Sequence, residues 1–178
     1  MHPTLSRIVA VSLWAVASAL LTIVVKPERP QQRAALATGV TLAVMDYALE
    51  FLADRLGIWR YHLQGTFLGL PPDLAADFFL LGYSFCLLYV AYSRRLTGRA
   101  TVAVFVVASG GVLGTVAFAH NRVAAAEGFV SFAPGFGPGD PWFAPGHYAL
   151  MTAAAAAIVW AYRYALRRLS SVDSMTAP

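Results

Sequence analysis

Long apolar stretches separated by short polar segments form the main pattern of this chain. Five of these stretches have about twenty residues each, and they cover residues 5–25, 34–54, 74–93, 100–119 and 147–166. About twenty helical residues are needed to cross a hydrocarbon core of roughly 30 Å, whereas the strands of a membrane barrel need only about ten. The pattern therefore predicts an all-α, polytopic membrane bundle of about five transmembrane helices, in a single membrane domain over residues 1–178.

Two connections differ from the short polar ones. The segment at about 55–73 contains GIWRY and LGLPP, and the segment at 120–146 is long and rich in Gly, Pro and Phe. A loop of that length in a compact protein is usually functional or disordered, and its aromatic residues do not suit a solvated linker. We expect 120–146 to be an outer loop at the membrane interface, acting either as a lid over the helix ends or as an anchor.

Glycine is concentrated in the fourth stretch, at Gly110, Gly111 and Gly114. Small residues at this spacing let a second helix backbone come close inside a membrane. The spacing predicts a tight helix–helix contact there.

The distribution of charge predicts the orientation. The chain has 178 residues, is 58% hydrophobic and only 12% charged, and has a formal net charge of +4. With five spans, segments 26–33 and 94–99 and the tail after 162 share one side and hold nine of the 13 Lys and Arg residues. We therefore expect the N-terminus outside and the C-terminus in the cytoplasm, in a plasma membrane of the bacterial inner-membrane type. The basic clusters suit anionic lipid headgroups and require no nucleic acid.

Carboxylates within the apolar pattern are the strongest functional signal. Asp46, Glu50 and Asp54 follow i, i+4, i+8 spacing, and Asp73 and Asp77 repeat that spacing where the next helix begins. Each ionisable group inside a membrane segment costs on the order of 3 kcal/mol or more, so it is read as functional by default. We expect these acids to meet in the outer half of the bundle, with Glu50, Asp77, Asp73 and Asp46 as catalytic candidates. Asp54 and Asp73 also suit ordinary interfacial or helix-capping roles.

The chemistry expected of such a site is proton transfer. A carboxyl group in an apolar environment favours its neutral form and can protonate an alkene, and aromatic ring faces stabilise the resulting cation. The residues that we expect to line this site and bind a hydrophobic substrate are Trp59, Tyr61, Tyr47, Phe78, Tyr83, Phe85, His120 and His147.

The run DRLGIWRYHLQGTFLGLPPDLAADFFLL, residues 54–81, resembles the lycopene cyclase domain of bacterial and archaeal membrane carotenoid cyclases. The resemblance extends over roughly residues 46–95 and is carried by an acidic helix end, G-x-W-x-Y, L-G-L-P and an acid before Phe-Phe. The residues that carry it are Gly57, Trp59, Tyr61, Gly69, Leu70 and Pro71. It implies a cofactor-free, redox-neutral ring closure of a polyene or related isoprenoid, with Asp73 as the acid of the motif.

The chain departs from this family in two respects. The family usually has two adjacent glutamates after the proline, whereas Leu74 follows Asp73 here and the next acid is Asp77. Family domains also tend to have three spans and to cooperate in pairs, whereas five spans are expected here.

Two other functions stay open. The i, i+4 acids could bind Mg²⁺ and present it to a diphosphate, as in membrane prenyl transfer. Alternatively, the protein is not an enzyme and relays protons, binds lipid, or serves as an accessory subunit in a homo- or hetero-oligomer.

Overall fold

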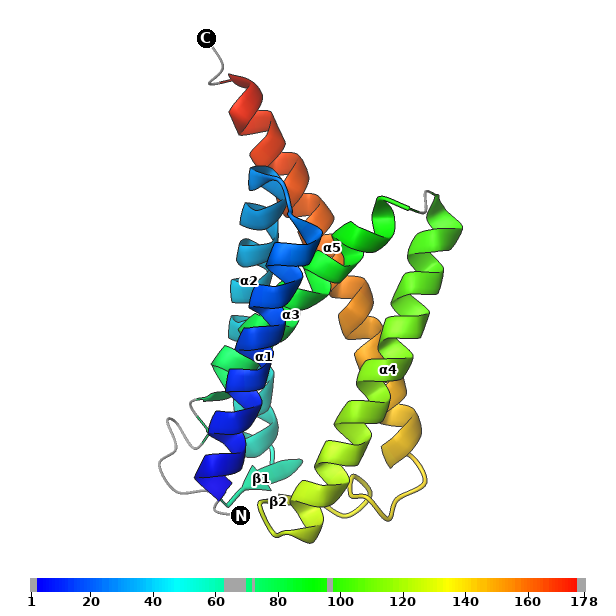
Figure 1. Cartoon of the computed structure of the whole chain (residues 1–178). Helices are drawn as coiled ribbons and strands as arrows, with labels where there is room; N and C mark the ends of the chain where they lie inside the picture. The colour runs from blue at the N-terminus through cyan, green and yellow to red at the C-terminus, as the bar shows by residue number, and fades with distance from the viewer. Residues whose placement is uncertain (1–2, 63–69, 72, 96–97, 176–178) are drawn as a thin grey trace. The chain divides into compact units, whose positions relative to one another are not determined.

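A computed structural model describes residues 3–62, 70–71, 73–95 and 98–175 of the chain. Within these residues the protein has five α-helices and one two-stranded antiparallel ribbon (Figure 1). In chain order the elements are α1 (Pro3–Val25), α2 (Arg29–Arg55), β1 (Trp59–Tyr61), α3 (Asp73–Ser93), α4 (Arg99–Ala126), β2 (Val130–Phe132) and α5 (Phe143–Met175).

Four of the helices are long and apolar enough to cross a membrane. These candidate spans are Arg29–Arg55, Asp73–Ser93, Val102–Ala126 and Phe143–Leu169, and the described apolar part of α1, Val11–Val25, is shorter. The all-α class is thus confirmed, and the four candidate spans support the expected multi-pass character. The start predicted for the outer loop is wrong, because α4 continues through residues 120–126 before the chain leaves the helix.

The described helices divide into two compact units. Unit 1 comprises residues 1–46, 73–102 and 157–178, and unit 2 comprises residues 47–72 and 103–156. Helices α2, α4 and α5 each contribute to both units. The single membrane domain expected from the sequence stays a prediction.

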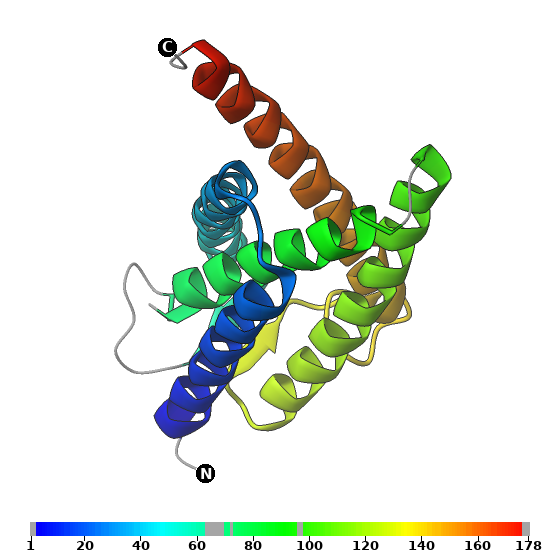
Figure 2. The same ribbon diagram turned by 45° about the horizontal axis from the view of Figure 1, so that its top comes forward.

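In unit 1, α1 packs along α3, and Figure 2 shows the two helices side by side. A buried hydrogen bond of 2.7 Å joins the hydroxyls of Ser18 and Ser84, and the hydroxyls of Thr22 and Tyr83 are 2.9 Å apart. Inside a membrane the hydrophobic effect does not drive helices together, so such interhelical hydrogen bonds contribute to their association. Arg94 adds a cap at the end of α1, where its guanidinium donates to the carbonyl oxygen of Val25 at 2.6 Å.

In unit 2, the contact between α4 and the first part of α5 depends on two glycines. A Cβ added to Gly110 would lie 2.6 Å from the Cα of Thr152, and one added to Gly114 would lie 3.0 Å from the Cα of Tyr148. The close contact predicted from the glycine spacing is confirmed at these two positions. A Cβ on Gly111 would meet no atom within 4 Å, so this glycine does not take part.

The ribbon of unit 2 connects the ends of two helices that terminate in the same way. Gly57, with φ of 70°, follows α2, and Gly128, with φ of 74°, follows α4. At each end the glycine N–H and the next N–H bond back to the last turn, which is a Schellman cap: Ile58 donates to Ala53, and Phe129 donates to Ala124. Each strand begins two residues after its glycine, and the strands pair with Arg60 opposite Ser131.

Candidate functional site

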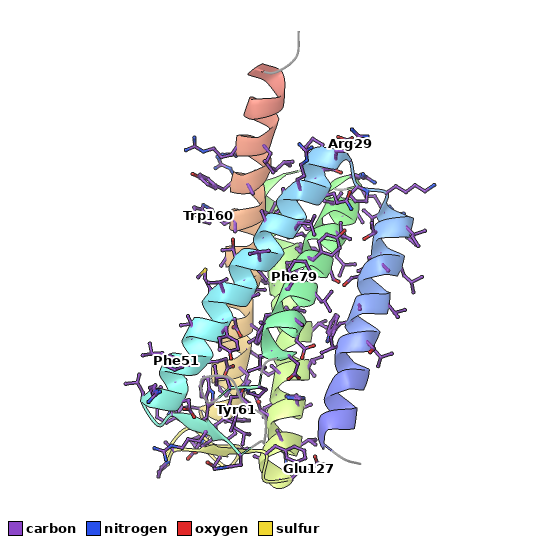
Figure 3. All side chains as sticks on the ribbon, turned by 90° about the vertical axis from the view of Figure 1, so that its left-hand side faces the viewer. Arg29, Phe51, Tyr61, Phe79, Glu127 and Trp160 are labelled. Atoms are coloured by element: carbon purple, nitrogen blue, oxygen red, sulfur yellow. The ribbon has the colours of Figure 1, made fainter. Side chains whose placement is uncertain are left out.

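Glu50 lies in the last turns of α2 and accepts two hydrogen bonds from the strand that follows. The indole Nε1 of Trp59 donates to Oε2 of Glu50 at 2.7 Å, and the hydroxyl of Tyr61 donates to the same oxygen at 2.9 Å. The carboxylate is partly buried. Figure 3 shows Tyr61 close to the end of α2 that carries Phe51. The structure therefore brings together three residues predicted as site residues.

The local sequence explains this arrangement. The left-handed conformation at Gly57 ends α2 and turns the chain back, so that β1 runs beside the last turns of the helix. Side chains alternate along a strand, so Trp59 and Tyr61 lie on one face while Arg60 lies on the other. Because the two donors are two positions apart on the strand, with Arg60 between them, both can reach one carboxylate. This is the physical reason for the G-x-W-x-Y spacing.

Aromatic rings extend from Trp59 toward α5. Trp59 is the partner of Phe132 in the ribbon, and their ring centroids are 6.5 Å apart. Phe132 meets the buried Phe143 edge to face at 5.4 Å, and Phe118 of α4 lies 5.7 Å from Phe143. Neither Phe132 nor Phe143 was among the predicted substrate-binding residues. We call this row of rings the aromatic wall. It consists of Trp59, Phe132, Phe143 and Phe118 and lies next to the Glu50 hydrogen bonds.

His147 is held at the end of this aromatic wall. Its Nδ1 lies 2.7 Å from the carbonyl oxygen of Phe143, and its Nε2 lies 2.8 Å from Nδ2 of Asn121. A carbonyl only accepts, so Nδ1 carries a proton, and Nε2 then accepts from the amide of Asn121. Both ring nitrogens are thus engaged within the protein. The role of His147 in substrate binding stays a prediction.

The other catalytic candidates belong to unit 1. Asp46 and Asp77 each have a buried carboxylate oxygen, Oδ2 and Oδ1 respectively, and Asp73 is the first residue of α3. Asp46, Glu50 and Asp54 keep their i, i+4 spacing on α2. Because Glu50 belongs to unit 2 and Asp77 to unit 1, the predicted meeting of these acids stays a prediction.

The remaining predicted substrate-binding residues have varied environments. Tyr83 and Phe85 are buried in unit 1, where the hydroxyl of Tyr83 bonds to Thr22. Tyr47 and Phe78 are half-buried, and His120 is exposed on α4. Their contact with a substrate stays a prediction. Gly69, one of the residues that carry the family resemblance, lies outside the described residues.

Asn121 and β2 were not identified from the sequence. The sequence did not single out Asn121, because placing a neutral amide side chain near the end of a membrane helix costs little free energy. The signal for β2 was a repeated spacing: Gly57 is followed by Trp59 and Tyr61, and Gly128 is followed by Val130 and Phe132. Two such strands that leave capped helices can pair, as the ribbon shows.

Within the described ranges, no group of three or more His, Cys, Asp or Glu side chains is arranged to hold a metal ion. The Mg²⁺ alternative therefore depends on the i, i+4 spacing of the acids alone. Comparison with models of protein families, with curated proteins and with solved structures finds no match to this chain. The assignment that follows depends on the residues themselves: a multi-pass helical membrane protein with a hydrogen-bonded carboxylate near the end of one candidate span.

Proposed function

We propose that the protein is an integral-membrane enzyme that cyclises or isomerises an isoprenoid or another unsaturated lipid by acid catalysis, without a cofactor. The observation that carries the proposal is the pair of hydrogen bonds from Trp59 and Tyr61 to Oε2 of Glu50. It supports the expectation drawn from the resemblance to the lycopene cyclase domain, because two motif residues hold a carboxylate inside a candidate span.

In this proposal the two oxygens of Glu50 have separate roles, which the hydrogen bonds to Oε2 support. Oε2 accepts two donors, so the proton of the neutral acid resides on Oε1. Transfer of that proton to an alkene carbon breaks the O–H bond, forms a C–H bond and leaves a carbocation. The donors to Oε2 stabilise the carboxylate that forms, and the ring faces of Trp59 and Phe132 stabilise the cation. Loss of a proton from a neighbouring carbon to the carboxylate restores the acid and gives an isomer of unchanged mass.

The membrane arrangement forms part of this proposal. In it α1 is a fifth span, the N-terminus lies outside and the C-terminus lies in the cytoplasm, which places the end of α2 near the outer surface of the plasma membrane. Asp46, Asp73 and Asp77 are further candidate acids. The buried oxygens of Asp46 and Asp77 support this role, because an acid that reacts with an apolar alkene must be shielded from water.

The test is the substitution Glu50→Gln, which keeps the size of the side chain and removes the transferable proton. Lipids extracted from cells that express each variant are compared by chromatography and mass spectrometry with those from cells lacking the gene. The wild type should yield an isomer of unchanged mass, and Glu50→Gln should lower its amount about 100-fold or more at equal protein level. Asp54→Asn, one turn along the same helix, is the matched control and should retain product. Undiminished product from Glu50→Gln would overturn the assignment.

A structural role for the same hydrogen bonds supports a second candidate, a membrane protein that is not an enzyme and acts in lipid binding or as an accessory subunit. In that case the bonds to Glu50 serve to hold β1 against α2. Glu50→Gln would then lower the thermal unfolding midpoint, and the lipid extracts would be the same with and without the gene.

A further inference from the structure

The outward face of the ribbon carries a cluster of hydrogen-bond donors. Alternation along the strands places Trp59 and Tyr61 on the face toward Glu50 and leaves Arg60 and His62 on the opposite face. Ser131, the partner of Arg60 across the ribbon, shares that opposite face, and its hydroxyl lies 2.8 Å from Nε2 of His62. Arg60, His62 and Ser131 are all exposed. We name these three residues the ribbon cluster.

The ribbon cluster lies where the membrane spans end. β1 follows the last residue of the α2 span by only a few positions, and β2 follows the end of α4 in the same way. The segment that leads from β2 to α5 exposes Phe136 and Trp142, with 54% and 76% of their surface accessible. Exposed aromatic residues of this kind concentrate at the level of the lipid headgroups. The ends of the spans and these aromatic residues therefore place the ribbon cluster beside lipid phosphates.

The side chains of the ribbon cluster suit a phosphate group. A guanidinium offers a planar fork of N–H donors that matches two oxygens of a phosphate, and a hydroxyl and an imidazole can add further donors. Residues directly opposite in an antiparallel pair have Cβ atoms about 5 Å apart, so Arg60 and Ser131 can contact one phosphate together.

We propose that the ribbon cluster binds the phosphate of an anionic membrane phospholipid, so that one face of the ribbon holds a lipid headgroup while the other holds Glu50. This site is separate from the proposed chemistry at Glu50 and does not depend on it. The guanidinium of Arg60 makes the main contact, and the hydroxyl of Ser131 completes it.

The experiment measures lipid retention. Purified full-length protein is placed in nanodiscs of phosphatidylcholine doped with phosphatidylglycerol, and the phosphatidylglycerol that stays bound is counted by native mass spectrometry. Arg60→Gln should weaken retention about tenfold, and Ser131→Ala should weaken it to a smaller extent. Arg122→Gln is the matched control, because Arg122 is an exposed arginine of unit 2 whose guanidinium lies 5.6 Å from the Phe118 ring centroid. Glu50→Gln should retain the lipid as the wild type does.

Two results would overturn the proposal. Equal losses in Arg60→Gln and Arg122→Gln would show that the lipid responds to net charge alone. A rise of the thermal unfolding midpoint with inorganic phosphate, lost in Arg60→Gln and not reproduced with phosphatidylglycerol, would assign the ribbon cluster to free phosphate instead. Circular dichroism of each variant in detergent verifies that the helices are intact.

Discussion

Trp59 donates a hydrogen bond of 2.7 Å from its indole to Oε2 of Glu50, which lies only nine positions earlier in the chain. The contact exists because α2 ends at a glycine in the left-handed conformation and the strand after it runs back beside the helix. The two aromatic residues of the G-x-W-x-Y motif, Trp59 and Tyr61, thus hold the carboxylate of Glu50 by hydrogen bonds.

Trp59→Phe and Tyr61→Phe should each lower product formation, because each removes one donor from Oε2. A hydrogen bond to a charged group contributes about 1.5–3 kcal/mol, so a loss of about tenfold to 100-fold is expected for each variant. Product per unit of purified protein, measured in lipid extracts, gives the comparison. Trp142→Phe changes an exposed indole elsewhere in unit 2 and should leave the yield unaltered. Full activity in both test variants would contradict a positioning role for these donors.

Gly110→Ala should destabilise the protein, whereas Gly111→Ala should not. The Cβ of an alanine at 110 would lie 2.6 Å from the Cα of Thr152, and one at 111 would meet nothing within 4 Å. Forcing extra volume into a packed contact costs about 1–3 kcal/mol, while alanine in an open helical position gains about 0.5–1 kcal/mol over glycine. Thermal unfolding midpoints in the same detergent measure both effects. Equal midpoints for the two variants would contradict the close contact of α4 with α5.

Ser18 and Ser84 should show energetic coupling in a double-mutant cycle. Their hydroxyls are buried and 2.7 Å apart across α1 and α3, and interhelical hydrogen bonds in membrane proteins average about 0.6 kcal/mol, with about 1.7 as the upper range. Ser18→Ala, Ser84→Ala and the double variant are compared by unfolding in mixed micelles. Thr41→Ala on α2 is the control, because its exposed hydroxyl donates to the carbonyl oxygen of Ala37 in the same helix at 2.9 Å, and it should not couple to Ser84. Strictly additive effects of Ser18 and Ser84 would contradict the hydrogen bond.

The sequence predicted the helices better than it predicted where they end. Hydropathy follows the hydrocarbon core, whereas a helix continues until a residue interrupts it. The apolar stretch at 100–119 gives way to polar residues, yet α4 continues through HNRVAAA to Ala126, because alanine favours helix and no breaker occurs before Gly128. Helix α5 likewise continues to Met175, well beyond the predicted 166, because no glycine or proline interrupts residues 166–175.

The sequence predicted those site residues whose placement in an apolar helix costs free energy. It did not predict residues whose placement there costs little. A carboxylate in an apolar helix, such as Glu50, can be recognised in the sequence because placing it there costs free energy. The sequence placed Trp59 and Tyr61 among the residues of the Glu50 site. It could not show that their side chains point toward Glu50, because that direction depends on the turn at Gly57. Phe143 has no distinguishing feature in an interfacial segment, and its neighbour Phe132 comes next to Trp59 only through the pairing of β1 with β2.

The ribbon also sets an order of assembly. The bonds from Trp59 and Tyr61 to Glu50 span nine and 11 residues and can form as soon as α2 and the residues after it have left the ribosome. The pairing that brings Ser131 to His62 joins positions 69 residues apart, and α3 and α4 lie between them. Two further helices must therefore be synthesised before the second strand can dock. A nascent chain halted after α3 would already hold its acid in place, but the aromatic wall and the ribbon cluster would still be incomplete.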